Sequence, residues 1–205
     1  MYIRDWMSRN VIWIESNASI QKALGLMKSH GIRHLPVRDK EGRFVGWITD
    51  SDVRGVLIAS MLEDLTVADV MIHNPYTVSP DEHLEDAARL MILKKIGGVP
   101  VVEYRDGEPV VVGVLTVVDV LRAFMEMFGG LARTERIDVS GTPELLKNLT
   151  PLVEAVQKAG GSIQSVCAFV PEAPNEDPVI SIHVRKGAVS NILEELGRLG
   201  IKVKE

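Results

Sequence analysis

Two segments of this chain, roughly residues 5–60 and 69–125, resemble each other in sequence. A shift of 64 residues aligns their first parts without a gap. After a three-residue insertion near 105–107, a shift of 67 aligns the rest and places Asp52 on Asp119. So many matches in order, with a single gap at an expected turn, are not a chance result. The sequence therefore indicates an internal duplication, and such a repeat constrains the fold before any other feature does.

Each copy has the pattern of a β-α-β-β-α unit. Apolar residues recur at helical spacing after Ile20 and after Leu84, which predicts a helix in each copy. A second helix is predicted after Thr49 and after Thr116. The predicted strands are 11–14, 35–38 and 44–48 in the first copy, and 76–78, 99–104 and 110–115 in the second. Because a unit of about 60 residues buries a low fraction of its surface, we expect the two copies to pack on each other.

The remainder of the chain has a different order of elements. It predicts strand, helix, strand, strand, helix and strand, at 136–139, 143–159, 162–170, 179–184, 188–199 and 201–204. This β-α-β-β-α-β order is that of the ferredoxin-like split arrangement. The predicted fold class is therefore α+β, with two repeats packed as a pair and a third domain. The predicted boundaries are 1–62, 63–128 and 136–205, with a linker at 129–135.

A Gly-x-x-Thr-x-x-Asp motif occurs once in each copy and ends at Asp52 and Asp119. A strand is expected to end at Thr49 or Thr116, and a helix to begin there. The start of a helix suits a phosphate, and a carboxylate one turn further on can accept ribose hydroxyls. The same spacing is also that of a capping box, and one such motif alone is more often a cap than a ligand site. Both interpretations stay open.

Three features in the same order resemble tandem CBS domains, the Bateman module, over about residues 1–126. They are Asp-Trp-Met and Asp-Val-Met at 5–7 and 69–71, the Ile-x-x-hydrophobic-Pro-Val blocks at 32–37 and 96–101, and the two Thr-x-x-Asp motifs. The resemblance implies that an adenine nucleotide (AMP, ADP or ATP) or S-adenosylmethionine binds in clefts between the repeats. It implies ribose contacts from the two aspartates, phosphate or ribose contacts from the two threonines, and clefts lined by Arg33, His34, Gly97 and Gly98.

The C-terminal segment resembles an ACT domain, a regulatory module that often binds amino acids. The resemblance rests mainly on element order and on the turn Ser140-Gly141-Thr142, which lacks the usual Pro-Gly order. The alternative is that this domain only mediates self-association. A CBS pair followed by an ACT-like domain is also the arrangement of acetoin-utilisation B-like proteins, although an analogy of fold does not fix a function.

The two copies differ in charge at positions that are expected to contact the ligand. Copy one supplies the cationic or ionisable residues Arg33, His34, Arg38, Arg43 and Arg54, but also Asp50, which would repel a polyphosphate. Copy two has Val117 in place of Asp50, and Gly97-Gly98 in place of Arg33-His34. We therefore expect one clear site, with its ribose carboxylate from Asp119 and with cations from copy one nearby.

Composition disfavours several classes of function. The net charge of −5 argues against a nucleic-acid surface, which needs a basic stripe. The single cysteine, Cys167, allows no intramolecular disulfide and fits the reducing cytoplasm; its apolar strand predicts an inert, buried thiol. No apolar stretch is long enough to span a bilayer. The histidines form no metal-binding pair, and neither a nucleophile elbow nor a P-loop is present, so we predict no metal site and no enzyme.

These observations predict a non-catalytic regulatory protein with no obligate cofactor. Its regulatory ligand would be an adenine nucleotide or S-adenosylmethionine, and it would signal through the ACT-like domain or through a protein partner. Apolar helix faces in the repeats predict a homodimer. Two alternatives stay open: a structural or assembly subunit with vestigial nucleotide sites, and an amino-acid-responsive regulator.

Overall fold

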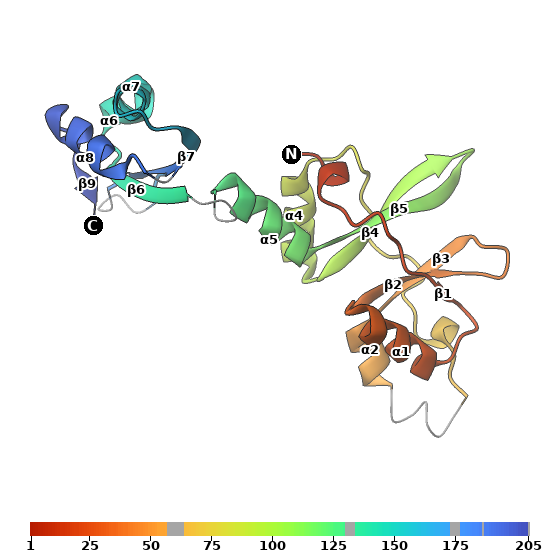
Figure 1. Ribbon diagram of the computed structural model, residues 1–205. Coiled ribbons are helices and arrows are strands. Elements are labelled where there is room, and N and C mark those ends of the chain that lie inside the picture. The colour runs from red at the N-terminus through yellow and green to blue at the C-terminus, as the bar shows by residue number, and fades with distance from the viewer. Residues whose placement is uncertain (57–63, 130–133, 173–176, 186, 205) are drawn as a thin grey trace. The chain divides into compact units, whose positions relative to one another are not determined.

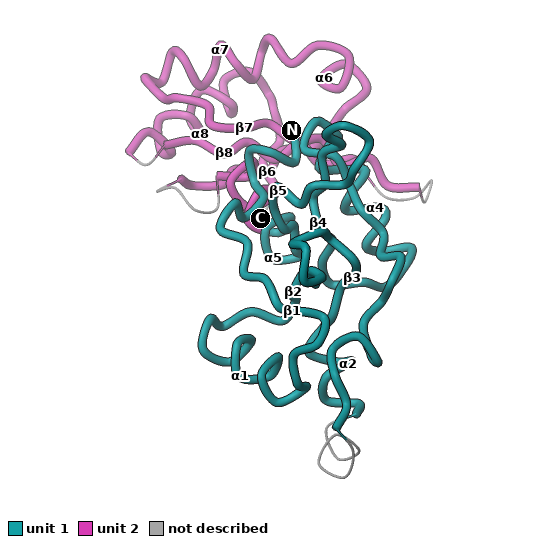
Figure 2. The backbone as a smooth tube through the Cα atoms, turned by 90° about the vertical axis from the view of Figure 1, so that its right-hand side faces the viewer, with its two compact units in different colours: residues 1–121 teal, residues 122–205 magenta. Residues whose placement is uncertain are grey.

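The computed structural model describes residues 1–56, 64–129, 134–172, 177–185 and 187–204. The chain divides into two compact units, residues 1–121 and 122–205, which Figure 2 shows in different colours. The first unit contains both repeats. The second unit begins within the last helix of the second repeat and contains the C-terminal sheet.

The first repeat has the predicted order of elements, around a three-stranded sheet. Its elements are β1 (Ile14–Glu15), α1 (Ile20–His30), β2 (His34–Arg38), β3 (Phe44–Thr49) and α2 (Asp50–Gly55). Strand β2 is central, parallel to β1 and antiparallel to β3. Helices α1 and α2 contact each other and lie against this sheet (Figure 1). The buried core consists of the apolar side chains that the helical and strand periodicities place inside, such as Ile20, Leu35 and Ile48.

The second repeat has longer strands and lacks the predicted first strand. Its elements are α4 (Leu84–Lys94), β4 (Gly98–Arg105), β5 (Glu108–Thr116) and α5 (Val117–Met127), with β4 antiparallel to β5. The strand predicted at 76–78 is reduced to a single parallel bridge between Val78 and Val101. The chain turns directly afterwards, because the Ser79 carbonyl accepts a hydrogen bond from the Glu82 N–H at 3.2 Å. In the first repeat the strand predicted at 11–14 is shifted, to Ile14–Glu15.

The first helices of the two repeats end in the same conformation through different residues. Gly31 ends α1 with a left-handed φ of 64°. Lys95 occupies the same position after α4 and adopts a φ of 54°. A lysine in place of glycine therefore does not change how the helix ends. A non-glycine residue in this region costs roughly 1–2 kcal/mol, which the surrounding packing must offset.

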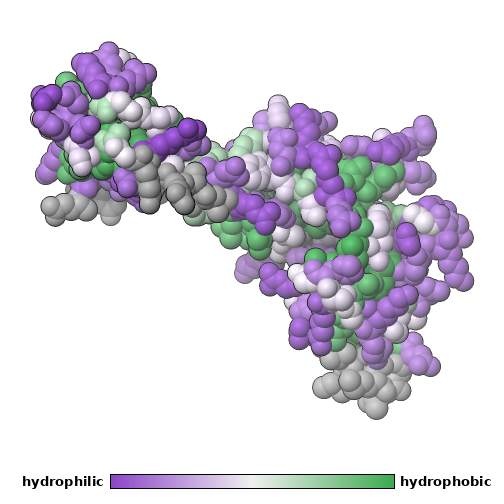
Figure 3. All heavy atoms as spheres, viewed as in Figure 1, coloured by the Kyte–Doolittle hydropathy of each residue, from purple (hydrophilic) through white to green (hydrophobic). Residues whose placement is uncertain are grey.

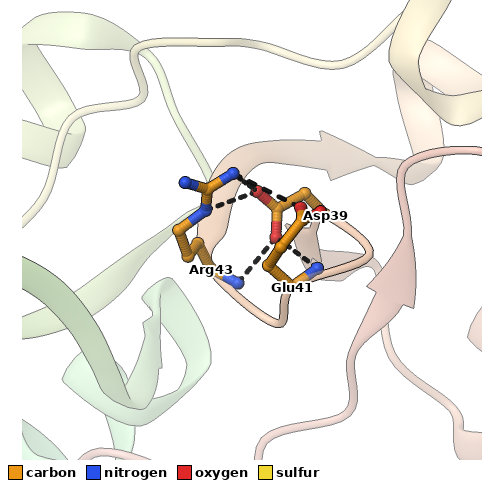
Figure 4. Close-up of polar contacts among 3 residues, drawn as sticks. All are labelled: Asp39, Glu41 and Arg43. Atoms are coloured by element: carbon orange, nitrogen blue, oxygen red, sulfur yellow. Dashed lines mark hydrogen bonds and ion pairs between the residues drawn. The ribbon is translucent and has the colours of Figure 1, made fainter.

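The hairpin turns also differ between the repeats. In the first, the Asp39 carboxylate accepts hydrogen bonds from the backbone N–H groups of Glu41 (3.0 Å) and Arg43 (2.8 Å) (Figure 4). The Arg43 guanidinium then pairs with the same carboxylate at 2.7 Å. In the second, Asp106 and Gly107 have φ of 53° and 84°, a pattern typical of a two-residue type I′ turn. The insertion detected in the sequence falls at this turn, as expected.

The segment that leads into each repeat packs on the other repeat. The short helix η1 (Ile3–Asp5) precedes repeat one, and its Ile3 N–H donates a hydrogen bond to the Glu82 carbonyl at 3.0 Å. The short helix η2 (Val67–Asp69) precedes repeat two, and its Val67 N–H donates a hydrogen bond to the Ala18 carbonyl at 2.8 Å. Val67 is fully buried in the core of the first repeat. The two copies therefore pack on each other, as predicted, and they also exchange their lead-in segments.

The motif glycines permit this exchange. Bridges join Trp47 to Ile72 and Ser8 to Val114. A Cβ at Gly46, beside the first bridge, would lie 2.6 Å from the Met71 Sδ atom and 3.0 Å from a backbone oxygen. A Cβ at Gly113, beside the second, would lie 2.6 Å from the Met7 Sδ atom. The glycine of each Gly-x-x-Thr-x-x-Asp motif thus has a structural role, independent of any ligand.

The second unit has a four-stranded antiparallel sheet. Its elements are β6 (Thr134–Ser140), α6 (Pro143–Lys147), α7 (Thr150–Lys158), β7 (Ile163–Phe169), β8 (Val179–Arg185), α8 (Val189–Arg198) and β9 (Val203–Lys204). The strand order is β7-β8-β6-β9, and all neighbours are antiparallel. The sequence of strands and helices is the one predicted, apart from a division of the first helix.

The helix predicted at 143–159 is two helices, so that prediction is wrong. Thr142 caps α6 by accepting a hydrogen bond from the Leu145 N–H at 3.3 Å. Asn148 then takes an extended conformation, and its side-chain oxygen accepts from the Thr150 N–H at 3.0 Å. Pro151, in the first turn of α7, has no N–H to continue the hydrogen-bond ladder of a single helix.

Of the linker predicted at 129–135, residues 130–133 lie outside the described residues, whereas Thr134 and Glu135 already belong to β6. Cys167 is only partly buried, contrary to the prediction, because β7 lies at the edge of the sheet. Among the described residues, none of the helices combines the length and apolar composition that a bilayer crossing requires.

Candidate functional site

Both Thr-x-x-Asp motifs form complete capping boxes. The Asp52 Oδ2 atom accepts hydrogen bonds from the Thr49 backbone N–H (2.9 Å) and hydroxyl (2.7 Å), and the Thr49 Oγ1 atom accepts from the Asp52 N–H (3.3 Å). Thr116 and Asp119 repeat this arrangement with distances of 2.9, 2.6 and 3.4 Å. The capping-box interpretation of the motif is therefore correct, because these residues cap the starts of the two helices.

A third threonine–aspartate pair forms the same two hydrogen bonds to its carboxylate elsewhere. Thr66 and Asp69, at the start of η2, are joined by hydrogen bonds of 2.8 and 2.6 Å to the Asp69 Oδ2 atom. Capping alone thus does not mark a ligand site. In all three boxes the hydrogen bonds to threonine use Oδ2, so the other carboxylate oxygen, Oδ1, lies outside the box.

The two motifs at the proposed cleft lie close together in the first unit. Strands β3 and β5, which end at Thr49 and Thr116, contact each other. The His34 ring of repeat one stacks on Trp47 with ring centroids 5.6 Å apart. The same ring lies against Gly98 of repeat two, where an added Cβ would be 3.1 Å from His34 Nδ1. The structure therefore brings residues predicted to line the cleft, from both copies, into contact.

Burial sets the charge of His34. Desolvation lowers the pKa of His34 below its ordinary value of 6.5, and the nearby Arg33 lowers it further. Asp52 and Asp50 oppose this effect more weakly. The imidazole is consequently neutral at pH 7, and it contributes packing rather than positive charge to this region.

We expect the stability of the first unit to fall as the pH is lowered from about 6.5 through the folded-state pKa of His34. In this window the unfolded chain binds the proton that the folded ring excludes, so protonation favours unfolding. Urea unfolding at pH 7.5 and pH 5.5 measures the change, and His34→Gln should reduce it. An unchanged pH dependence in His34→Gln would contradict this assignment.

The surplus of basic residues expected in repeat one is largely neutralised. Arg38 pairs with Glu15 at 2.8 Å, Arg43 with Asp39 at 2.7 Å, and Arg54 with Asp50 at 2.6 Å. Two of these acidic partners, Glu15 and Asp39, lie outside the Gly-x-x-Thr-x-x-Asp motif. The Asp50–Arg54 pair joins residues four apart, a spacing from which the sequence could have predicted it. The repulsion expected from Asp50 is reduced by this pair.

Equivalent backbone contacts show how the two repeats differ. In repeat one, the N–H of Asp50 donates to the Arg33 carbonyl at 2.9 Å. In repeat two, the N–H of Val117 donates to the Gly97 carbonyl at 3.1 Å. The geometry is conserved between the copies, whereas an acidic and a basic residue are replaced by valine and glycine.

A hollow among the described residues lies elsewhere on the first unit. It encloses about 390 Å³ and is lined by residues 77–82 and 102–104. None of the predicted site residues lines it. Its carboxylates, Asp81, Glu82 and Glu103, make it poorly suited to a phosphate.

In the second unit, the turn that suggested an ACT domain is already engaged internally. The Gly141 N–H donates to the Pro178 carbonyl at 2.8 Å, and a Cβ at Gly141 would lie 2.8 Å from the Pro178 Cβ. The backbone donor that this turn could offer to an amino acid is therefore occupied. Within the described part of the chain, no three His, Cys, Asp or Glu side chains are grouped so that they could hold a metal ion.

Comparison with known proteins identifies relatives of the first unit. A curated relative, L-aspartate semialdehyde sulfurtransferase from Methanocaldococcus jannaschii, is 36% identical over 123 residues, covering 60% of this chain and 23% of that protein. The chain thus spans less than a quarter of this relative.

Three solved structures are also similar. The CBS domain pair of protein MJ0100, in complex with 5′-methylthioadenosine and S-adenosyl-L-methionine, is 34% identical, with TM-score 0.54 and coverage of 60% of this chain and 95% of that one. CBSX2 from Arabidopsis thaliana, in complex with AMP, is 30% identical, with TM-score 0.53 and coverage of 60% and 96%. A putative acetoin utilization protein from Vibrio cholerae is 26% identical, with TM-score 0.53 and coverage of 61% and 90%.

The CBS domain family matches this chain twice, over residues 3–59 and 67–126. These ranges correspond to the two copies detected in the sequence, and together they exceed half of the chain. The match ends at residue 126 and leaves the C-terminal sheet unassigned. The chain belongs to the CBS-domain family and carries a tandem CBS pair.

Proposed function

We propose that this protein is a non-catalytic regulator that binds an adenosine-based ligand between its CBS repeats. The observation that carries the proposal is the contact between β3 and β5, each of which ends in a Thr-x-x-Asp box with one carboxylate oxygen outside the box. Related CBS pairs that hold AMP, or S-adenosyl-L-methionine with 5′-methylthioadenosine, support this ligand class. The ligand is regulatory, and no obligate cofactor is required.

The proposed site uses the residues predicted from the sequence. Asp52 and Asp119 hold ribose hydroxyls, Thr49 and Thr116 contact the ribose or its 5′ substituent, and the cleft is lined by Arg33, His34, Gly97 and Gly98. One of the two positions, with Asp119 as the ribose carboxylate, is the stronger. His34, packed against Gly98, supports a site to which both repeats contribute.

The remaining parts of the proposal concern signalling. The domains are 1–62, 63–128 and an ACT-like domain at 136–205, and α5 runs continuously from the Asp119 motif towards the last of these. Apolar side chains are exposed along α5 (Figure 3), and a homodimer or a protein partner would cover them: Val118, Leu121 and Met125. The occupied Gly141 N–H disfavours the alternative of an amino-acid-responsive regulator.

The proposal is tested by thermal unfolding with AMP, ADP, ATP, S-adenosylmethionine and 5′-methylthioadenosine. A ligand that binds only the folded state, at 100 times its dissociation constant, adds about 2.7 kcal/mol of stability. Asp119→Ala should abolish this effect, and Asp52→Ala should reduce it less. If Asp52→Ala alone abolished binding, the assignment of the stronger position would be wrong.

The third capping box supplies a matched control. Asp69→Ala removes the same hydrogen bonds to a threonine as Asp119→Ala does, so both variants should lose about 1 kcal/mol of stability. Only Asp119→Ala should also lose the ligand. A protein that responds to none of the adenosine compounds would favour a structural or assembly subunit whose nucleotide sites have become caps.

A further inference from the structure

We propose that the outer edge of strand β4, in the second repeat, binds an extended, basic segment of a partner protein as an added β-strand. The outer edge is the one that faces away from β5. It borders the hollow that is lined by residues 77–82 and 102–104. This surface is separate from the proposed adenosine site, because none of the residues of that site lines the hollow.

A proline leaves this edge open. In repeat one, β1 covers the equivalent edge of β2, and the Ser16 N–H then donates to the Arg38 carbonyl at 2.9 Å. The shift of 64 residues places Pro80 on Ser16 and Val102 on Arg38. Proline has no N–H, so the Val102 carbonyl lacks the equivalent donor. The segment that covers the edge in repeat two is therefore shorter than β1, and it forms only a single bridge to β4.

Strand β4 continues beyond this point (Figure 1). It has eight residues, whereas β2 has five. The Val102 N–H donates to the Val78 carbonyl at 2.8 Å, so the backbone polar groups of Val102 point away from β5. These groups alternate in direction along an antiparallel strand, so those of Tyr104 point the same way. They are placed to form hydrogen bonds with an added strand, and the Tyr104 side chain beside them is 73% exposed.

The walls of the hollow select the charge of the partner. Asp81, Glu82 and Glu103 line it, and its lining includes no lysine or arginine. Asp81 pairs with Arg4, and Glu103 pairs with Arg105. Both ion pairs are exposed to water, where such pairs are weak, so an incoming lysine or arginine can share these carboxylates. The hollow therefore favours a basic segment and repels an acidic one.

A second copy of this chain fits the edge less well than a basic partner does. Two copies joined along their β4 edges would bring two acidic hollows together, and like charges oppose such pairing. The chain as a whole also has a net charge of −5. The occupant is therefore a different chain, with positive charge on its extended segment.

The full chain, isotope-labelled for NMR, is titrated with an end-capped hexapeptide of alternating valine and lysine. Amide signals within residues 77–82 and 102–104 should shift saturably. A hexapeptide with glutamate in place of lysine should bind at least tenfold more weakly. Absence of a saturable shift, equal binding of the two peptides, or shifts confined to other residues would overturn the proposal. So would concentration-dependent shifts of the same amides without peptide, because they would show that a second copy occupies the edge.

Two variants test the edge and the charge separately. Pro80→Ser supplies the N–H that Ser16 supplies in repeat one, so it should cover the Val102 carbonyl and weaken binding of the valine–lysine peptide at least fivefold. Glu103→Lys should weaken binding of this peptide at least tenfold and reverse the preference between the two peptides. Glu108→Lys, an exposed residue of β5 outside the hollow, makes the same change of charge and should keep the original preference. Unchanged binding in the folded Pro80→Ser and Glu103→Lys proteins would overturn the proposal.

Discussion

Gly113→Val should destabilise the first unit by about 1–3 kcal/mol, the usual cost of overpacking a well-packed site. The new Cβ would lie 2.6 Å from the Met7 Sδ atom and 3.1 Å from the Ser8 carbonyl oxygen. The methionine can move, but the backbone of Ser8 is held by its bridge to Val114. Urea unfolding followed by tryptophan fluorescence measures the loss, because all three tryptophans, Trp6, Trp13 and Trp47, lie in the first unit.

Two further variants distinguish the steric clash at Gly113 from the general effect of replacing a glycine. Gly25→Ala lies inside α1 with no atom within 4 Å of the added Cβ, so it should stabilise the protein by about 0.5–1 kcal/mol. Met7→Ala combined with Gly113→Val should recover part of the stability lost in the single Gly113 variant. If Gly113→Val were as stable as the unchanged protein, the role assigned to the lead-in exchange would be wrong.

The order of elements in the repeats was predictable because it depends on local periodicity. Apolar side chains at helical spacing and a left-handed glycine at residue 31 define α1 from its own sequence. The exchange of lead-in segments was not predictable in this way. It depends on contacts such as that of Ile3 with Glu82, between residues far apart in the chain, and η1 is too short to carry a periodic pattern.

The misplaced elements have local causes that the pattern of apolar residues does not reveal. The division of the helix at Asn148 arises from a side-chain hydrogen bond to the Thr150 N–H together with Pro151. Lys95 takes the left-handed conformation that sequence statistics reserve for glycine, because the chain must turn there to enter β4. In each case, interactions of one or two polar or constrained residues outweigh an apolar periodicity.

The candidate site was predictable in its positions but not in its electrostatics. The duplicated motif located Thr49, Asp52, Thr116 and Asp119, and each pair forms the same hydrogen bonds. The sequence could not show that Arg38 forms an ion pair with Glu15, which lies 23 residues away in the chain. Counting arginines therefore overestimated the positive charge available to a phosphate in repeat one.

The second large effect is expected in the C-terminal unit. Ile182 is fully buried on β8, the strand that pairs with both β6 and β7. Ile182→Ala should therefore cost this unit about 2–5 kcal/mol, through the lost burial and the cavity left behind. Leu193→Ala, at a side chain on α8 that is 40% exposed, is the control and should change stability by less than about 0.5 kcal/mol.

The Ile182 variant also tests whether the two units fold independently. Far-UV circular dichroism should show an early transition in Ile182→Ala, while the tryptophan transition keeps its midpoint, because the tryptophans report only on residues 1–121. A saturating adenosine ligand should raise the tryptophan transition and leave the early one unchanged, since the proposed site lies wholly within the first unit. A shift of the tryptophan midpoint by Ile182→Ala alone would mean that the units unfold as one. In that case α5, the continuous helix shared by both units, would transmit stability as well as a ligand signal.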